Sequence, residues 1–266
     1  MPELARPTVT LHYEDSGASS GGAPTLVFLH GWCDGSPSWA DTIAEFRREY
    51  RCIAPDMRGH NRSGQPRDFC YSAEALSNDV VALCQSLGVA HPVLIGHSFG
   101  GYLAAETARR LPGFARAVLV EDQLLDLRGF GEQMRALEAV IRSAENHMTF
   151  RTQLYDSMTS PLMPPESRAL ISRMKDQTPV EIGQALWAPL FEFTPEEMAE
   201  RSDLLMQALG NQPSLTIEHE ATPEYHATLA RLAPDAATRV IDAGHWIHLE
   251  RPADFRAELR DFLSAV

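Results

Sequence analysis

Basic residues are scarce in this sequence, and lysine occurs once, at position 175. Asp and Glu together number 36 against 23 for Lys and Arg, which gives a formal net charge of −13. Nucleic-acid binding depends on basic patches that neutralise phosphates, so this balance argues against a nucleic-acid partner. The same shortage of positive charge argues against binding to an anionic membrane surface.

Long apolar runs and targeting signals are also missing. No run approaches the ~20 residues that a membrane-spanning helix needs. The first residues have neither the basic nor the apolar segment of a secretory signal peptide. Four cysteines occur without the spacing of a zinc site or a C-x-x-C pair, so we expect free thiols and a cytoplasmic protein. No His and carboxylate cluster has convincing metal spacing, and we expect no metal or other cofactor.

Apolar runs and helical patterns alternate along most of the chain. Residues 25–29, 51–55 and 92–95 have the composition of short, buried parallel strands. Helical patterns separate them, over residues 39–50 and 73–87. This alternation is typical of an open, mostly parallel sheet with helices on both faces, and it predicts an α/β protein.

The alternation stops after residue 124 and resumes at about residue 213. The segment 125–212 has helical patterns interrupted by prolines. We therefore expect a core formed by residues 1–124 and 213–266, with residues 125–212 inserted as a helical cap over the carboxyl edge of the sheet. Some apolar side chains of the cap should face the substrate, and Trp187 is a candidate.

A G-x-S-x-G sequence spans residues 96–100 and centres on Ser98. The apolar run before it and the helical pattern after it match the strand, turn and helix of a nucleophile elbow. Such a turn exposes the serine hydroxyl above the sheet and directs the N–H of Phe99 at a developing oxyanion. His97 precedes the serine at the edge of the site, where we expect a mainly structural role.

The loop after residues 25–29 should complete the oxyanion site. It reads His30-Gly31-Trp32-Cys33. The backbone N–H of Trp32 is the expected second donor, because backbone donation does not depend on the side chain. Trp32 and Cys33 would then also border the substrate.

A histidine and a carboxylate would complete the candidate site. His245 stands in a loop after a C-terminal strand pattern, where the general base of this kind of site lies. The triad acid normally follows the strand pattern at residues 214–217, but that loop has no aspartate. Asp122, after the preceding strand pattern, is the replacement; its neighbour Glu121 should point away, because strand side chains alternate. His219, in the loop without the acid, is a candidate to fill that space.

These motifs, over residues 9–266, resemble those of the α/β-hydrolase fold. Three finer features resemble a small branch of it, the cofactor-independent 2,4-dioxygenases of 3-hydroxy-4(1H)-quinolones, some of which degrade the alkylated Pseudomonas quinolone signal. The first feature is the position of Asp122 after the earlier strand. The other two are the motifs Gly31-Trp32-Cys33 and Thr222-Pro223-Glu224-Tyr225.

The resemblance implies a reaction with dioxygen that needs no metal or flavin. His245, held by Asp122, would remove the 3-hydroxyl proton of the quinolone, and Ser98 would position the substrate. The N–H groups of Trp32 and Phe99 would hold the ring oxygen. The products would be an N-acylanthranilate and carbon monoxide. The apolar, methionine-containing cap favours an aromatic substrate with an alkyl tail over a methylated ring.

Two other functions fit the same residues. A serine hydrolase (an esterase, a lactonase or a carbon–carbon bond hydrolase) would use Ser98 as nucleophile, with His245 as base and Asp122 as acid. A non-catalytic binding protein of this fold is the third hypothesis, but the intact elbow, histidine and acid argue against it. A haloalkane dehalogenase is not expected, because its elbow would carry aspartate in place of Ser98.

Overall fold

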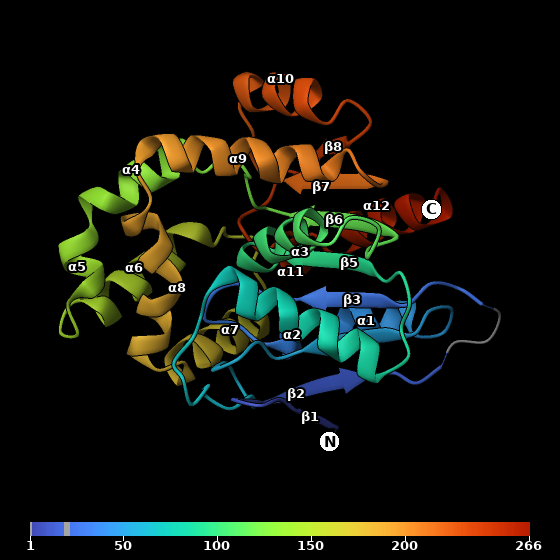
Figure 1. Ribbon diagram of the computed structural model, residues 1–266, viewed down its shortest axis with the longest axis horizontal. Coiled ribbons are helices and arrows are strands. Elements are labelled where there is room, and N and C mark those ends of the chain that lie inside the picture. Colours follow the sequence, from blue (N-terminus) through green and yellow to red (C-terminus); the bar gives the residue numbers. More distant parts are fainter. Residues whose placement is uncertain (1, 19–21) are drawn as a thin grey trace.

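The computed structural model describes residues 2–18 and 22–266; residues 1 and 19–21, within the predicted core, lie outside the described part. An eight-stranded sheet runs through this part (Figure 1), in the order β1-β2-β4-β3-β5-β6-β7-β8. β1 and β2 are antiparallel to their neighbours and the other strands are parallel. The predicted mostly parallel open sheet is therefore confirmed. The strands are β1 (Glu3–Ala5), β2 (Thr10–Asp15), β3 (Leu26–Leu29), β4 (Cys52–Pro55), β5 (Val93–His97), β6 (Ala117–Glu121), β7 (Ser214–Glu218) and β8 (Ala237–Val240).

The central strands are buried on both faces, which explains their continuous apolar runs. In β3, Val27 and Leu29 belong to one hydrophobic cluster, while Leu26 and Phe28 belong to the other. This division follows from the alternation of side chains along a strand. Helices α1, α11 and α12 contribute to the cluster of Leu26, and α2, α3, α9 and α10 contribute to the opposite one. The bounds are α1 (Ala40–Phe46), α2 (Ala73–Ser86), α3 (Phe99–Arg110), α9 (Pro195–Leu209), α10 (Pro223–Leu232), α11 (Ile247–Glu250) and α12 (Pro252–Ser264).

One predicted helix differs from the structure, and one strand was not predicted. The helix expected over residues 39–50 begins as a 3-10 turn at Ser36–Trp39 and continues as α1, which ends at Phe46. Strand β1 was not predicted, because three residues are too few to show a period. It forms by pairing with β2, as in Leu4 opposite Leu11.

Helices occupy the segment between β6 and β7, as predicted, and prolines separate several of them. α7 begins at Pro165 and α8 follows Pro179, positions that suit proline because the first N–H groups of a helix have no intrahelical acceptor. Pro189 lies inside α8, near its end at Glu192. Helices α4 to α8 stand beyond the carboxyl ends of the parallel strands, while α9 returns and packs against α3 (Figure 1). The exact cap limits stay a prediction. The bounds are α4 (Arg128–Ala136), α5 (Glu138–Arg142), α6 (His147–Met158), α7 (Pro165–Gln177) and α8 (Val180–Glu192).

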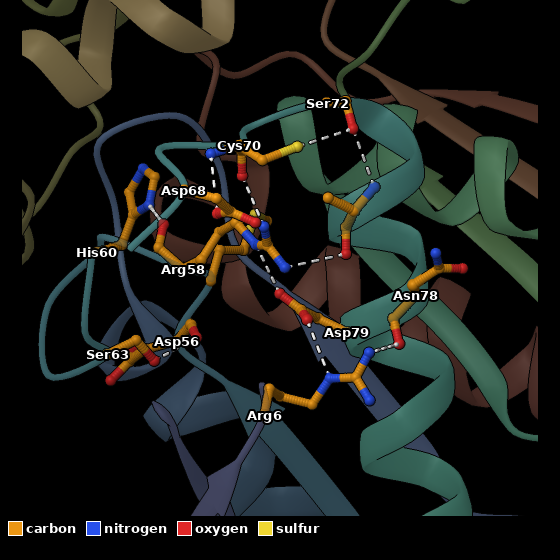
Figure 2. A network of polar contacts seen from close by, with 12 residues as sticks. Arg6, Asp56, Arg58, His60, Ser63, Asp68, Cys70, Ser72, Asn78 and Asp79 are labelled. Carbon is orange, nitrogen blue, oxygen red and sulfur yellow. Dashed lines mark hydrogen bonds and ion pairs between the residues drawn. The ribbon is translucent and has the colours of Figure 1, made fainter. Parts of the chain in front are cut away.

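The loop after β4 is fixed to α2 by a buried arginine. Figure 2 shows Arg58 reaching Asp79 of α2 with Nε, at 2.8 Å, and the carbonyl oxygen of Cys70 with a second nitrogen, at 2.6 Å. Arg6 approaches the other carboxylate oxygen of Asp79 at 3.4 Å. A paired and hydrogen-bonded charge can remain buried, so this network holds the loop in place beside the sheet.

No helix in the described ranges, 2–18 and 22–266, combines the length and the apolar character that crossing a bilayer requires.

The tight elbow makes a specific stability prediction. A Cβ added at Gly96 would lie 2.1 Å from the carbonyl oxygen of Gly100, a backbone atom that has no room to move. We expect Gly96→Ala to lower the free energy of unfolding by about 3 kcal/mol or more, as severe overpacking does. Gly129→Ala, on α4, is the control, because nothing lies within 4 Å of its added Cβ. Urea denaturation measures both, and equal midpoints would contradict this account.

Candidate active site

Ser98 stands on a strained turn between β5 and α3. Its backbone has φ 51° and ψ −123°, a conformation that a non-glycine residue adopts only when the surrounding structure enforces it. The Ser98 N–H donates to the carbonyl of Glu121 at 2.8 Å, which ties the turn to the end of β6. The serine thus lies at the carboxyl edge of the sheet, where it lines the main cavity.

The structure brings His245 and Asp122 into contact. His245, in the loop after β8, places its Nδ1 2.5 Å from Oδ2 of Asp122, which follows β6. An ionised carboxylate only accepts, so Nδ1 carries the proton and Nε2 is left as a proton acceptor. The His245 backbone N–H donates to the carbonyl of Met158 at 2.8 Å, so the last residue of cap helix α6 also fixes this loop.

A second histidine binds the same carboxylate. His219, in the loop after β7, donates its backbone N–H to Asp122 Oδ1 at 2.7 Å, and its Nδ1 lies 2.7 and 2.8 Å from the two carboxylate oxygens. Burial alone would raise the pKa of Asp122, but the hydrogen bonds from His219 and His245 outweigh it and lower that pKa. The predicted space-filling residue is therefore also a partner of the displaced acid.

Glu121 points to the other face of β6, as the alternation predicts. Its Oε1 lies 2.7 Å from the backbone nitrogen and 2.8 Å from Nδ1 of His248, and its side chain is fully buried. It is outside the lining of the main cavity. The structure thus directs Asp122, and not its neighbour, toward His245.

The loop after β3 lies against the elbow. A Cβ on Gly31 would be 3.4 Å from Cβ of Ser98. Within the described residues the N–H groups of Trp32 and Phe99 donate to no protein acceptor, so both are available to a ligand. The indole N–H of Trp32 donates to the carbonyl of Gly183 at 3.0 Å, and the Tyr155 hydroxyl donates to the carbonyl of Trp32. Cap helices α6 and α8 therefore hold this loop.

The other predicted site residues occupy three different positions. His97 is buried, and its Nε2 donates to the carbonyl of His245 at 2.9 Å, so it supports the histidine loop. Burial lowers the pKa of His97, which keeps it neutral. Trp187 lines the cavity and packs edge-on against Trp32, with ring centroids 5.1 Å apart. Cys33, by contrast, turns into the protein, where Arg151 donates to its sulfur at 3.3 Å.

Cys33 lies outside the cavity lining, so the structure does not bring it to the substrate space. Its φ of 53° turns the side chain away from the elbow and into the packing beneath the cap. Burial raises the pKa of its thiol to about 11, which leaves the sulfur protonated and unreactive near neutral pH.

The main cavity has a volume of about 880 Å³, within the range of small-molecule sites. Ser98, His245 and Asp122 lie on its sheet side, and the cap supplies apolar side chains opposite them. Within the described residues, no group of three or more metal-binding side chains is arranged to hold an ion. Tyr155 belongs to the apolar cap residues from which the sequence predicts part of the lining, whereas Glu218 was not singled out from the sequence. The apolar cap residues of the lining include Phe130, Leu154, Met158, Leu186, Trp187 and Leu190.

Residues 26–258 match the model of the alpha/beta hydrolase family, and the chain belongs to that family. The match covers most of the sequence and includes the elbow, Asp122 and His245. The predicted resemblance to the α/β-hydrolase fold is therefore confirmed.

Similarity to individual curated proteins is modest. The chain is 34% identical to epoxide hydrolase 1 of Caenorhabditis elegans over 105 residues, 39% of this chain and 26% of that protein, so it spans about a quarter of that relative. It is 27% identical to the sn-1-specific diacylglycerol lipase ABHD11 of Mus musculus over 259 residues, 91% of this chain and 81% of that one.

Solved structures of hydrolases superpose on nearly the whole chain. The enol-lactonase of Burkholderia xenovorans LB400 aligns with a TM-score of 0.78, 20% identity and coverage of 99% of this chain and 100% of that chain, a similarity of fold alone. Est816, described as an N-acyl homoserine lactone degrading enzyme, aligns with a TM-score of 0.79, 25% identity and coverage of 98% and 100%. These comparisons support a hydrolase more than the predicted quinolone dioxygenase.

The His219 pairing predicts how stability depends on pH. The hydrogen bond to Asp122 raises the pKa of His219 above its ordinary value. The pairing then stabilises the fold below the ordinary histidine pKa, and this contribution is lost as pH rises through the raised pKa. We expect His219→Gln to destabilise the protein more at about pH 5 than at about pH 9, on either side of the histidine range.

Denaturant titrations at both pH values measure this effect. The matched control is His219→Gln in an Asp122→Asn background, where the partner charge is gone and the pH dependence of the difference should disappear. A pH-dependent difference of the same size in both backgrounds would show that Asp122 is not the cause.

Proposed function

We propose that this chain is a hydrolase that cleaves an ester or lactone bond in a largely apolar substrate. The observation that carries the proposal is the 2.5 Å contact between His245 Nδ1 and Asp122, beside Ser98 on its strained elbow. Membership of the alpha/beta hydrolase family supports it. The similarity to Est816 and to the diacylglycerol lipase supports a substrate with a carboxylic ester or lactone group.

The mechanism follows from the proton positions. His245 Nε2 takes the hydroxyl proton of Ser98 while the serine oxygen attacks the carbonyl carbon of the substrate. Asp122 holds the ring by Nδ1 and stabilises the imidazolium that forms. The tetrahedral oxyanion accepts hydrogen bonds from the free N–H groups of Trp32 and Phe99. His245 then gives its proton to the leaving alcohol, and water repeats the sequence on the acyl-serine.

The predicted quinolone dioxygenase remains a second candidate, because one feature favours it. The described hydrogen bonds of the His245 ring run to Asp122, and the Ser98 hydroxyl takes no part in them. His245 Nε2 is therefore free to take a proton from a substrate hydroxyl instead of from the serine. The cavity of about 880 Å³ has room for a bicyclic ring with an alkyl tail.

In that reaction the substrate anion itself reacts with dioxygen. Removal of the 3-hydroxyl proton leaves an electron-rich ring, and dioxygen adds at C2. The peroxide closes on C4, and collapse of the ring releases C3 as carbon monoxide. The two oxygen atoms remain in the acyl carbonyl and the carboxylate of the N-acylanthranilate, so the atoms balance without a metal or a flavin.

Two assays on the same purified protein separate the candidates. One measures cleavage of p-nitrophenyl butyrate; the other measures carbon monoxide released from a 2-alkyl-3-hydroxy-4(1H)-quinolone with and without oxygen. For a hydrolase we expect ester cleavage that falls about 10⁴-fold or more in Ser98→Ala, because the nucleophile is lost. For a dioxygenase the rate of carbon monoxide release should fall only about tenfold in the same variant, because one hydrogen bond to the substrate is lost.

His245→Ala should abolish either reaction, because both need the base. His91→Ala is the matched control, since this histidine is outside the cavity and contacts the carbonyl of Gly113. Ester cleavage that survives in Ser98→Ala, without oxygen-dependent carbon monoxide, would overturn the hydrolase proposal. Carbon monoxide that depends on oxygen and on His245 would establish the second candidate.

A further inference from the structure

Besides three histidines, the ionisable side chains of Asp, Glu, Lys and Arg type that line the main cavity are all acidic. Among the described lining residues five carry a carboxyl group and none is a lysine or an arginine. Most of these carboxylates have a partner or face water: Asp122 binds two histidines, and Asp126 lies 2.8 Å from Arg128. Glu220 and Glu224 are exposed. The fifth, Glu218, is different.

Glu218 ends strand β7 and is buried without a partner. Its exposed fraction is 1%, yet it belongs to the cavity lining. Oε1 has no hydrogen-bond partner, and no described ion pair includes this carboxyl group. Alternation along β7 sends Leu215 and Ile217 into the core on the other face, so Glu218 is directed to the face of the sheet that carries the cavity.

The surroundings of Glu218 favour the neutral form of its carboxyl group. Burial, and then the neighbouring carboxylates of Asp122 and Glu121, raise the pKa of Glu218 well above its ordinary value. Asp122 and Glu121 each have a histidine partner, whereas Glu218 has none. Glu218 therefore holds a proton more readily than an ordinary glutamate, and in its protonated form the carboxyl group is a hydrogen-bond donor.

We propose that Glu218 is a second anchor of the substrate: its carboxylic O–H donates a hydrogen bond to an uncharged acceptor oxygen, a carbonyl or an ether. The proposal rests on the main cavity being the substrate site, and it holds for either of the two candidate reactions. It explains why a buried polar side chain with an unsatisfied oxygen lines the cavity.

The sheet sets the distance between this anchor and the reacting atom. Ser98 follows β5 and Glu218 ends β7, and β6 lies between these strands. Two strand spacings separate the positions by about 10 Å. This backbone spacing sets the scale for the substrate, so we design test compounds with a neutral acceptor oxygen about 10 Å from the bond that reacts. A carboxylate at that point would meet Asp122, and no described lysine or arginine lines the cavity to offset it.

Three esters of p-nitrophenol test this selectivity. One has a nonanoyl chain, the second has the same chain with a ketone at the penultimate carbon, and the third is the half-ester of nonanedioic acid. We expect the protein to prefer the ketone ester in kcat/KM and to reject the half-ester. Glu218→Leu should lose about fivefold to tenfold of the preference for the ketone, the factor that one neutral hydrogen bond supplies.

Two variants keep this test specific. Glu218→Gln retains an N–H donor of nearly the same shape and should keep most of the preference for the ketone ester. Glu196→Gln removes an exposed carboxylate of α9 that lies outside the cavity lining and should leave the preference unchanged. If Glu218→Gln instead admits the half-ester while the ketone preference is absent in every form, Glu218 is an ionised repelling group and the proposal is wrong.

Infrared spectroscopy tests the anchor without any turnover, so it separates failure of this proposal from failure of the proposed hydrolase. A protonated carboxylic acid has its own carbonyl stretch, which we expect in the protein and not in Glu218→Gln. Binding of methyl nonyl ketone should shift that band to lower frequency as the O–H becomes bonded. Absence of the band, or a band that the ketone does not move, would overturn the assignment.

Discussion

The carboxylate of Asp122 is the point on which the site depends. It receives hydrogen bonds from His245, in the loop after β8, and from His219, in the loop after β7. Both hydrogen bonds join residues that are far apart in the sequence, so no local sequence pattern predicts them. Because the acid is buried, its charge is stable only with these partners, and the loops are ordered by the same bonds. The same hydrogen bonds therefore determine the orientation of His245 and the stability of the loops at the carboxyl edge of the sheet.

This arrangement also shows how an acid can change strands within one fold. In the expected position, after β7, the chain has His219 instead of an aspartate. The imidazole of His219 reaches the carboxylate of Asp122, which directly follows β6. A hydrogen-bond donor therefore occupies the expected position of the acid, and the acid lies one strand away. The carboxylate partner of His245 is therefore Asp122, after β6, in place of an acid after β7. The exchange preserves the hydrogen-bond pattern because parallel strands end at the same edge of the sheet.

Much of the fold was readable in the sequence because buried parallel strands are continuous apolar runs. Ser98, Asp122 and His245 could be grouped for a related reason, since each follows a parallel strand and the carboxyl ends of the parallel strands meet at one edge. Glu218 and the hydrogen bond of Tyr155 to Trp32 could not be found this way. A glutamate ending a strand is ordinary until Asp122 and Glu121 are known to be near it, and Tyr155 acquires a partner only when the cap docks.

The orientation of the Cys33 side chain could likewise not be predicted from the sequence. Its place after Trp32 suggested a position beside the substrate, but a φ of 53° turns the thiol toward Arg151. Backbone conformations of this kind depend on tertiary neighbours and leave little trace in residue type. Family membership has a similar limit, because a shared fold fixes where chemistry can occur and leaves the reaction to particular side chains.

The cap of this protein covers the candidate site and also holds two of its loops in place. The Tyr155 hydroxyl and the Gly183 carbonyl, both from cap helices, hold the backbone and the indole of Trp32, and the carbonyl of Met158 holds the N–H of His245. Evolution of new substrate range in such a chain is therefore constrained. A cap grafted from a relative would have to reproduce these three tethers, or the core beneath it would lose the alignment of its oxyanion donor and its base.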